Sequence, residues 1–422
     1  MCWDRMRWVD DDTLHVFDLV RGICRAASAE CGDAKERAAM KIAAAQTVTA
    51  IERLARADRR HAALVEQWDA DPWLLNTPGG TVDLHTGELH GNNREQYLTK
   101  MTAAAPGGDC SLWRCFLDRV TAGNSELQAF LQRVIGYCLT GSIREHALFF
   151  LYGTGANGKS VFLYTIAGLL GDYAKSAPAS AFTASSTEQH PTDVAGLRGA
   201  RFVTATETED GRWWAEAKIK NLTGGDRVTA RFMRQDFFEY IPQFKLVVAG
   251  NHKPGLRSVD EAIRRRLNLI PFTVTIGEQE RDPKLAEKFK AEYPGILQWA
   301  IEGCLMWQRE GLNPPSAVRE ATADYLAAED TIGRWLEDRC ITGQGSWTTG
   351  AVLFADYHAW SERAGERTTS QKRFTQALES RGFVQKRTRV ARGFEGIELR
   401  AGVTHVTDSP VIAVIRARER SI

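Results

Sequence analysis

One glycine-rich stretch constrains the fold of this chain more than any other feature. Residues 151–163 read LYGTGANGKSVFL and follow the apolar run ALFF. The stretch fits the pattern GxxxxGK(S/T) at Gly153, Gly158, Lys159 and Ser160. An apolar strand runs into the loop and the helical segment KSVFLYTIAGLLG runs out of it, which puts the loop at a helix N-terminus. The sequence therefore predicts a loop that binds a nucleoside triphosphate.

The residue types in this loop have distinct expected roles. Glycines allow backbone N–H groups to turn toward phosphates, Lys159 reaches the β and γ oxygens, and the Ser160 hydroxyl is a ligand for Mg²⁺. We therefore expect ATP and Mg²⁺ as cofactors. The residues expected to bind the nucleotide are Gly153, Thr154, Gly155, Ala156, Asn157, Gly158, Lys159, Ser160 and Val161.

Two acidic residues end a second apolar strand, in the segment RFVTATETEDG. A carboxylate at this point would hold the water shell of a metal ion and polarise an attacking water molecule. We expect Glu207 to be the principal metal-side or catalytic carboxylate and Glu209 to be the second acid of the site. A solvated acidic loop is the alternative interpretation.

A third apolar strand, in FKLVVAGNHKP, stops at Asn251, which is suited to sense the γ-phosphate or to orient the water. An ordinary turn asparagine is the alternative. Three consecutive arginines follow in SVDEAIRRRLNLIPF. They form either a solvated basic helix face or, in a ring ATPase, an arginine finger that acts on the neighbouring subunit. For the finger we favour Arg265 over Arg266 and Arg264.

Composition excludes several classes of protein. The 422 residues are 43% hydrophobic and 25% charged, as expected of a globular protein with more than one core. No run is apolar and long enough to span a bilayer and no signal peptide is present, so we expect a cytoplasmic location. The eight cysteines contain no CxxC pair and indicate neither a zinc module nor a disulfide framework. With a formal net charge of +1, any nucleic-acid surface must come from local clustering.

Taken together, these motifs resemble a known family. The ordered segments RFVTATETEDG, AEAKIKNLTGGDRVTARFMRQDFFEYIPQFKLVVAGNHKPGL, DEAIRRRLNLIPFTVTI and RDPKL are similar to the superfamily 3 helicase domain of phage and plasmid primase-helicases, which are related to the poxvirus primase-helicase. The upstream segments LLNTPGGTVDLHTGEL and FLQRVIGYCLTG extend the likeness to residues 8–400. The resemblance implies a hexameric ring that translocates on single-stranded DNA, usually 3′ to 5′. The family often carries a primase domain upstream, which we do not expect here.

The expected fold class follows from the resemblance and from the alternation of strand-like and helix-like segments over residues 144–266. It is α/β, with a P-loop AAA+-type parallel-sheet ATPase core, an N-terminal accessory α/β region and a C-terminal winged-helix domain. Helical spacing is expected from residue 12 to residue 68. The expected domains are an accessory region, a superfamily 3 helicase ATPase domain, a helical linker with the winged helix, and a tail, at residues 1–110, 111–312, 313–402 and 403–422.

The resemblance also indicates where DNA is contacted. The family has a DNA-contacting hairpin between the acidic strand and the asparagine strand, and VTARFMRQDFFEYIPQF here predicts a strand, a tip at residues 233–236 and a second strand. Such a tip would grip phosphates without reading sequence. A surface hairpin with no partner is the alternative. The residues expected to contact DNA in this region are Lys218, Lys220, Arg231, Arg234 and Gln235.

The C-terminal segment has a different charge pattern. Residues 371–392 contain seven basic residues and one acidic residue. The segment TTSQKRFTQALESRGF predicts a capped helix, and VQKRTRVARGFEGIELR predicts the β wing that follows it. We expect DNA contacts here, and the alternative is a protein-docking domain. The residues expected to make these contacts are Lys372, Arg373, Lys386 and Arg387.

Two functions remain open. In the first, the protein is a motor that couples ATP hydrolysis to movement on single-stranded and forked DNA, as a homo-hexamer and with a possible separate primase or replication proteins as partners. In the second, it is an ATP-regulated DNA-binding replication initiator or assembly ATPase without unwinding activity. A P-loop small-molecule kinase is disfavoured because nothing resembles a substrate lid.

Overall fold

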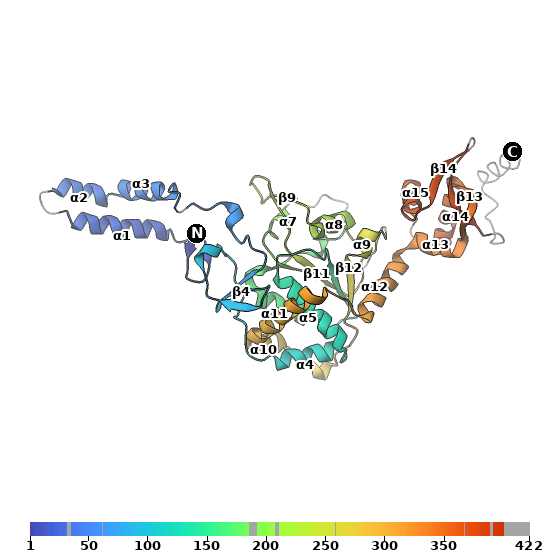
Figure 1. Ribbon diagram of the computed structural model, residues 1–422, viewed down its shortest axis with the longest axis horizontal. Helices are drawn as coiled ribbons and strands as arrows, with labels where there is room; N and C mark the ends of the chain where they lie inside the picture. Colours follow the sequence, from blue (N-terminus) through green and yellow to red (C-terminus); the bar gives the residue numbers. More distant parts are fainter. Residues whose placement is uncertain are drawn as a thin grey trace.

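A five-stranded parallel sheet lies at the centre of the molecule, between an N-terminal helical arm and a C-terminal α/β unit (Figure 1). The computed structural model describes residues 1–31, 35–60, 62–184, 192–206, 211–257, 259–366, 368–388 and 391–400. The strand order is β12-β6-β11-β8-β7, and each neighbouring pair is parallel. The strands are β6 (Leu148–Tyr152), β7 (Ala174–Ser176), β8 (Phe202–Thr206), β11 (Lys245–Gly250) and β12 (Leu267–Pro271).

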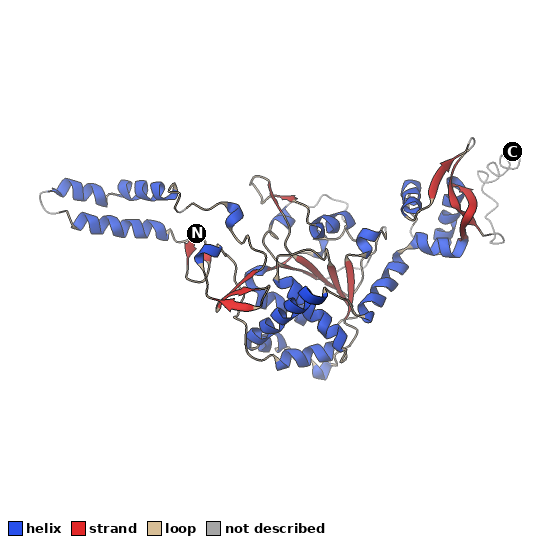
Figure 2. Ribbon diagram, viewed as in Figure 1, coloured by secondary structure: helices blue, strands red, loops and turns tan. Residues whose placement is uncertain are grey.

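The sheet is apolar because helices cover both of its faces (Figure 2). Side chains alternate between the faces along each strand. On β6, Phe149 and Leu151 belong to one core, whereas Leu148 and Phe150 belong to the other. The predicted parallel sheet with crossover helices is therefore confirmed.

Two helical layers complete the central body. The first layer packs on the Phe149 face and consists of α4 (Ser111–Val120), α5 (Ser125–Leu139), α6 (Lys159–Leu170), α10 (Leu285–Ala291) and α11 (Tyr293–Glu310). The second layer packs on the Phe150 face and contains α7 (Thr192–Ala195), α8 (Glu216–Gly224), α9 (Glu261–Arg264) and α12 (Ser316–Glu329). A hairpin of β9 (Val228–Ala230) and β10 (Phe238–Tyr240) follows α8 in the chain.

Helices α5 and α11 approach each other so closely that only glycine fits at their crossing. A Cβ atom on Gly136 would lie 2.0 Å from the backbone nitrogen of Cys304. A Cβ atom on Gly303 would lie 2.1 Å from the backbone oxygen of Gln132. Any side chain at either position would therefore push the two helix backbones apart.

We expect Gly136→Ala to destabilise the protein by about 1–3 kcal/mol or more, because the added methyl group meets backbone atoms that cannot move without shifting a helix. Gly22→Ala is the matched control. Gly22 is also helical, but a Cβ atom added there would have nothing within 4 Å, so alanine should cost nothing at that position. The midpoint of urea unfolding, followed by tryptophan fluorescence, measures both effects. Equal midpoints for the two variants would contradict the packing argument.

The N-terminal region has its own small sheets and a projecting arm. An antiparallel sheet of β3 (Leu74–Thr77), β4 (Gly80–Asp83) and β5 (Glu88–His90) packs on the first core through Leu75, Val82 and Leu84. A hairpin of β1 (Cys2–Trp3) and β2 (Trp8–Val9) precedes the arm. The arm consists of α1 (His15–Ala29), α2 (Glu36–Ala43) and α3 (Ala45–Arg56), and extends away from the body (Figure 1).

The helical pattern predicted up to residue 68 ends earlier, at Arg56. The side chain of Asp58 accepts hydrogen bonds from the backbone and the guanidinium group of Arg60. Such a local side-chain bond offers the backbone an alternative to the helix. Beyond it, the segment forms only a short 3-10 turn at Val65–Gln67.

Two buried cations tie the N-terminal region and the sheet to the C-terminal end of α5. Arg201 donates to the backbone oxygens of Leu139, at 2.7 Å, and Leu74, at 2.9 Å. Lys245 donates to the backbone oxygen of Thr140. The last carbonyls of a helix lack helical partners, and these two side chains satisfy them as hydrogen-bond donors. Burial lowers the pKa of both side chains, and that of Lys245 falls to about 7.

The lowered pKa of Lys245 predicts a pH-dependent stability. Between about pH 7 and the ordinary lysine pKa near 10.4, the unfolded chain binds more protons at this position than the folded protein does. Stability from this group should therefore rise with pH, by at most about 1.4 kcal/mol per pH unit. Lys245→Met removes the titration. The difference in unfolding free energy between wild type and Lys245→Met should grow from pH 6 to pH 9, and a constant difference would mean that the buried amine stays charged throughout.

The C-terminal unit folds around a separate core. It consists of α13 (Thr331–Arg339), β13 (Cys340–Thr349), α14 (Gly350–Arg363), α15 (Gln371–Ser380), β14 (Val384–Arg387) and β15 (Arg392–Leu399). The strands form an antiparallel sheet in the order β13-β15-β14. Inside this unit, Asp356 accepts hydrogen bonds from Arg339, at 2.6 Å, and from the Trp335 indole, at 2.9 Å. The helix predicted in TTSQKRFTQALESRGF and the strand pair predicted in VQKRTRVARGFEGIELR are confirmed, as α15 and as β14 with β15.

One carboxylate joins the C-terminal unit to the central body. Asp330, between α12 and α13, accepts from the backbone N–H of Gly333 at 2.9 Å and so caps α13. Its side chain also pairs with Arg381, at the end of α15, and lies 3.6 Å from the guanidinium group of Arg264 in α9. Within the described part of the chain, every helix is too short or too polar to traverse a bilayer.

Candidate functional site

The glycine-rich loop connects β6 to α6 at the carboxyl edge of the sheet. Gly153, Gly155, Ala156 and Gly158 all have positive φ angles, of 158°, 99°, 48° and 86°. A Cβ atom on Gly153 would lie 2.0 Å from the backbone oxygen of Phe272, so no other residue fits there. The loop is thus bent by glycines, and α6 begins directly after it at Lys159.

Lys159 is held over the loop by three acceptors. Its ammonium group donates to the Gly153 backbone oxygen at 2.8 Å, to Asn157 Oδ1 at 3.0 Å and to Asn251 Oδ1 at 3.3 Å, and the residue is 6% exposed. Asn157 is oriented in turn, since its Nδ2 donates to the backbone oxygen of Phe272 at 2.8 Å. Burial lowers the pKa of Lys159. The side chain is therefore fixed at the start of α6, where backbone N–H groups favour anions.

Asn251 reaches Lys159 because β11 is the direct neighbour of β6. Gly250, the last residue of β11, pairs in register with Tyr152, the last residue of β6. The sequence predicts that the asparagine strand ends near the loop, and the structure brings the two side chains together. The role of Asn251 as a sensor stays a prediction.

The remaining predicted residues of the loop differ in accessibility. Thr154, Ala156 and Ser160 are exposed, and Val161 is half-buried. The two predicted acids, Glu207 and Glu209, lie outside the described residues. The strand that leads to them, β8, ends at Thr206 and pairs with β11, so it ends at the same edge of the sheet as the loop.

The three consecutive arginines lie at the opposite end of β6 from the loop. The backbone oxygen of Arg266 accepts from the N–H of Leu148, the first residue of β6, at 2.7 Å. The strand is five residues long, or roughly 16 Å at about 3.3 Å per residue. This cluster therefore lies at the far edge of the sheet, away from the loop of its own chain.

The structure corrects the inclusion of Arg266 among the finger candidates. Arg266 is 6% exposed, and its guanidinium group donates to Thr223 Oγ1 at 3.1 Å and to the Ala262 backbone oxygen at 2.8 Å. Burial, with the neighbouring Arg265, lowers its pKa. It joins α9 to α8 inside the protein. Arg264 pairs with Asp330, whereas Arg265 is exposed at the end of α9.

The predicted hairpin is present. Its tip is longer than the predicted residues 233–236, since β9 ends at Ala230 and β10 begins at Phe238. Arg234 and Gln235 are exposed at the tip, as predicted. The tip is also apolar, which the sequence interpretation missed. The exposed apolar side chains there are Phe232, Met233 and Phe237, which are 40%, 69% and 58% exposed. Their signal was visible in the segment ARFMRQDFF, where apolar residues flank the charged ones.

Two of the lysines expected to contact DNA lie outside this hairpin. Lys220 lies on α8 and pairs with Asp260, whose side chain caps α9. In the structure Lys220 is therefore engaged within the protein, and its contact with DNA stays a prediction. Lys218, on the same helix, is half-buried, and burial lowers its pKa. Arg231 lies at the base of the tip with its guanidinium carbon 4.6 Å from the centre of the Phe237 ring.

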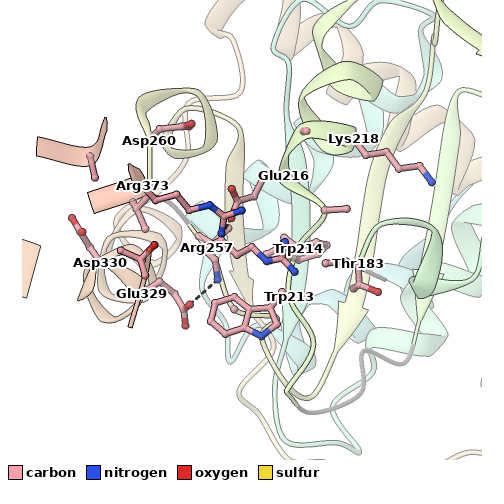
Figure 3. Close-up of a pocket in the computed structure, with 18 of the residues that line it drawn as sticks. Thr183, Trp213, Trp214, Glu216, Lys218, Arg257, Asp260, Glu329, Asp330 and Arg373 are labelled. Carbon is pink, nitrogen blue, oxygen red and sulfur yellow. Dashed lines mark hydrogen bonds between the residues drawn. The ribbon is translucent and has the colours of Figure 1, made fainter. Parts of the chain in front are cut away.

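The C-terminal residues predicted to contact DNA are all exposed but face different surroundings. Lys386 pairs with Glu395 of the neighbouring strand at 2.5 Å, whereas Arg387 ends β14. Arg373 lines a cleft between α15 and the central body (Figure 3). Lys372 is not among the residues that line this cleft. Arg227 and Arg257 line the same cleft from the central body. The sequence interpretation missed both, because isolated arginines in loops carry no pattern.

Two known families match parts of the chain. The family described as "D5 N terminal like" matches residues 1–122, and a "Family of unknown function (DUF5906)" matches residues 151–266. "The apo structure of NrS-1 C terminal region" covers 70% of this chain and 78% of its own, with 10% sequence identity and a TM-score of 0.47.

Curated relatives come from large DNA viruses. "Putative helicase L207/L206" of Acanthamoeba polyphaga mimivirus is 25% identical over 245 residues, which are 54% of this chain and 25% of that protein. "Putative helicase 022R" of Frog virus 3 is 25% identical over 253 residues, or 55% of this chain and 26% of that protein. "Putative helicase 184R" of Invertebrate iridescent virus 6 is 31% identical over 155 residues, which are 35% of this chain and 16% of that protein. The chain thus matches about a quarter or less of the length of each of these relatives.

The matches confirm the family that the ordered motifs resemble. They include the N-terminal region, through the D5 family, and relatives that carry helicase names. At the level of its helicase domain, the chain is similar to the D5-like primase-helicase family.

Proposed function

We propose that this protein is an ATP-dependent DNA helicase of phage and plasmid-type replication, a ring-forming motor that couples ATP hydrolysis to translocation on single-stranded DNA. The observation that carries the proposal is the placement of Lys159, which the loop and Asn251 hold at the N-terminus of α6. A fixed cation, bent glycine backbone and a helix N-terminus together are the chemistry that recognises a triphosphate.

The residues at this edge of the sheet fit ATP and Mg²⁺. Gly153 and Gly158 have positive φ angles, which glycine adopts without strain, and the exposed Ser160 hydroxyl is a suitable Mg²⁺ ligand. Mg²⁺ would supply Lewis-acid polarisation of the phosphate oxygens. Lys159 would balance charge on the β and γ phosphates. Glu207 would bind the water shell of the metal ion and, with Glu209, orient the attacking water. Asn251 would sense whether the γ-phosphate is present.

A ring is supported by the position of the arginines. Arg265 is exposed at the far end of β6, about 16 Å of strand away from the loop of its own chain. A finger at this place acts only on a neighbouring subunit. We therefore propose a homo-hexamer in which Arg265 stabilises the transition state across each interface.

DNA contacts are proposed at the hairpin and in the C-terminal unit. The β9–β10 hairpin lies in the chain between the acidic strand β8 and β11, so nucleotide state at the sheet edge would tilt it. The order α13-β13-α14-α15-β14-β15, with a basic α15 and a two-stranded wing, supports a winged helix. We propose domain limits of 1–110, 111–312 and 313–402. The predicted tail at 403–422 lies outside the described residues.

Lys159→Ala tests the motor in two assays, ATP hydrolysis and strand displacement from a forked duplex with and without ATP. We expect hydrolysis to fall about 10²-fold or more, because the charge on the β and γ phosphates is lost, and strand displacement to disappear with it. Lys175→Ala, at an exposed lysine on the edge strand β7, is the matched control and should be unchanged. Unchanged hydrolysis in Lys159→Ala would refute the nucleotide site. Hydrolysis in wild type without strand displacement would favour the ATP-regulated initiator or assembly ATPase.

A mixing experiment tests the finger in trans. Arg265→Ala and Lys159→Ala should each be inactive, but rings that contain both proteins include interfaces with an intact lysine and an intact arginine. We expect these mixed rings to recover part of the ATPase activity. Arg266→Ala should show no such recovery, since Arg266 supports the fold inside the protein. If verified mixed rings of the first pair stay inactive, Arg265 does not act across the interface.

A further inference from the structure

A large cleft separates the central body from the C-terminal unit (Figure 3). Its volume is about 1790 Å³, compared with about 300–1,000 Å³ for a pocket that holds a small molecule. One wall comes from α8, the segment after β11 and the start of α9. The other wall comes from the α12–α13 junction and α15. The cleft is thus large enough for a segment of a polymer.

The carboxylates that line this cleft are all engaged by donors of the protein itself. Glu216 accepts from the Arg257 backbone at 2.6 Å, and Glu329 accepts from the Leu256 backbone at 2.7 Å. The other three carboxylates form ion pairs: Asp260 with Lys220, Asp330 with Arg381, and Glu366 with Arg334. Burial also raises the pKa of Glu329. The acidic side chains are therefore occupied.

Unlike these carboxylates, the arginines that line the cleft from both walls form no ion pair among the described residues. Arg227, Arg257 and Arg373 are exposed, and among the residues that the structure describes no carboxylate lies within 4 Å of their guanidinium groups. Figure 3 shows Arg257 and Arg373 extending into the same space from opposite walls. Cations of like charge that face each other across a gap repel, and an anion between them removes the repulsion. Guanidinium groups bind phosphate with two parallel hydrogen bonds.

An aromatic ring adds a second kind of contact. Trp213 is half-buried in the wall of the cleft, with its ring packed against Gly255. The ring is part of the same surface as Arg257 (Figure 3). Bases stack on such rings only where they are unpaired, as in a single strand. Arginines with an aromatic ring are the combination found in grooves that track single-stranded nucleic acid.

We infer that the cleft between the central body and α15 binds a single strand of nucleic acid through its phosphates, with Arg227 and Arg257 on one wall and Arg373 on the other. This inference deepens the proposed function and rests on its nucleic-acid partner. It divides α15 into two faces. Arg373 contacts the strand inside the cleft, and Lys372, one residue away, lies outside it.

The test is equilibrium binding of a fluorescent single-stranded thymine oligonucleotide to the full chain, without ATP, over a range of salt concentrations. Each of Arg227→Ala, Arg257→Ala and Arg373→Ala should weaken binding. Each should also reduce the slope of log K against log salt by about 0.7, the value for one lost phosphate contact on a single strand. The triple variant should lose about three times that slope. Arg373→Lys, which keeps the charge, should retain the slope.

Two further variants make the result specific. Arg309→Ala removes an exposed charge at the end of α11, outside the cleft, and should leave affinity and slope unchanged. Lys372→Ala should reduce the slope less than Arg373→Ala does. Equal losses for Lys372→Ala and Arg373→Ala would show that α15 binds through its outer face, and would overturn the inference. An unfolding midpoint for each variant confirms that the fold is intact.

The outcomes separate this inference from the motor. An unchanged slope in the triple variant, or wild-type protein that does not bind the oligonucleotide, overturns the cleft whatever the result of the strand-displacement assay. A blunt duplex that binds as tightly as the oligonucleotide, with the same dependence on the three arginines, overturns the single-strand assignment. Arginine-dependent binding in a protein that hydrolyses ATP but never separates a fork supports the cleft and refutes the motor.

Discussion

The ammonium group of Lys159 connects the parts on which the candidate site depends. It joins the loop after β6 to Asn251 after β11, and its neighbour Asn157 extends the same chain of hydrogen bonds to Phe272 after β12. Three adjacent strands are thus linked at their carboxyl ends by side chains that a single buried cation orients. The parallel sheet makes this possible, because only parallel strands bring all three of these ends to one edge.

Features set by local chemistry could be predicted from the sequence, and features set by distant contacts could not. The bent loop, the apolar strands and the β9–β10 hairpin follow from residues within a few positions of each other. The burial of Arg266 depends on Thr223 of α8, and nothing in a run of three arginines distinguishes it from Arg265. A weak signal was present, since Arg266 directly precedes the apolar strand β12.

Ion pairs between separate elements are contacts that the site prediction did not foresee. Lys220 was expected to contact DNA, but Asp260 lies forty residues along the chain and its approach depends on the packing of α9 on α8. The same limit applies to Lys245, which stands at the start of an apolar strand and was not predicted to neutralise the end of α5. Charged residues inside or beside apolar segments are therefore the positions where a tertiary partner should be sought.

The carboxylate of Asp330 contacts both the central body and the C-terminal unit. It caps α13, pairs with Arg381 of the C-terminal unit and contacts Arg264, the residue immediately before Arg265. The C-terminal unit and the end of α9 thus both contact the same carboxylate. A nucleic-acid strand bound by that unit and an arginine presented to a neighbouring subunit would both be connected to Asp330, the single residue between α12 and α13.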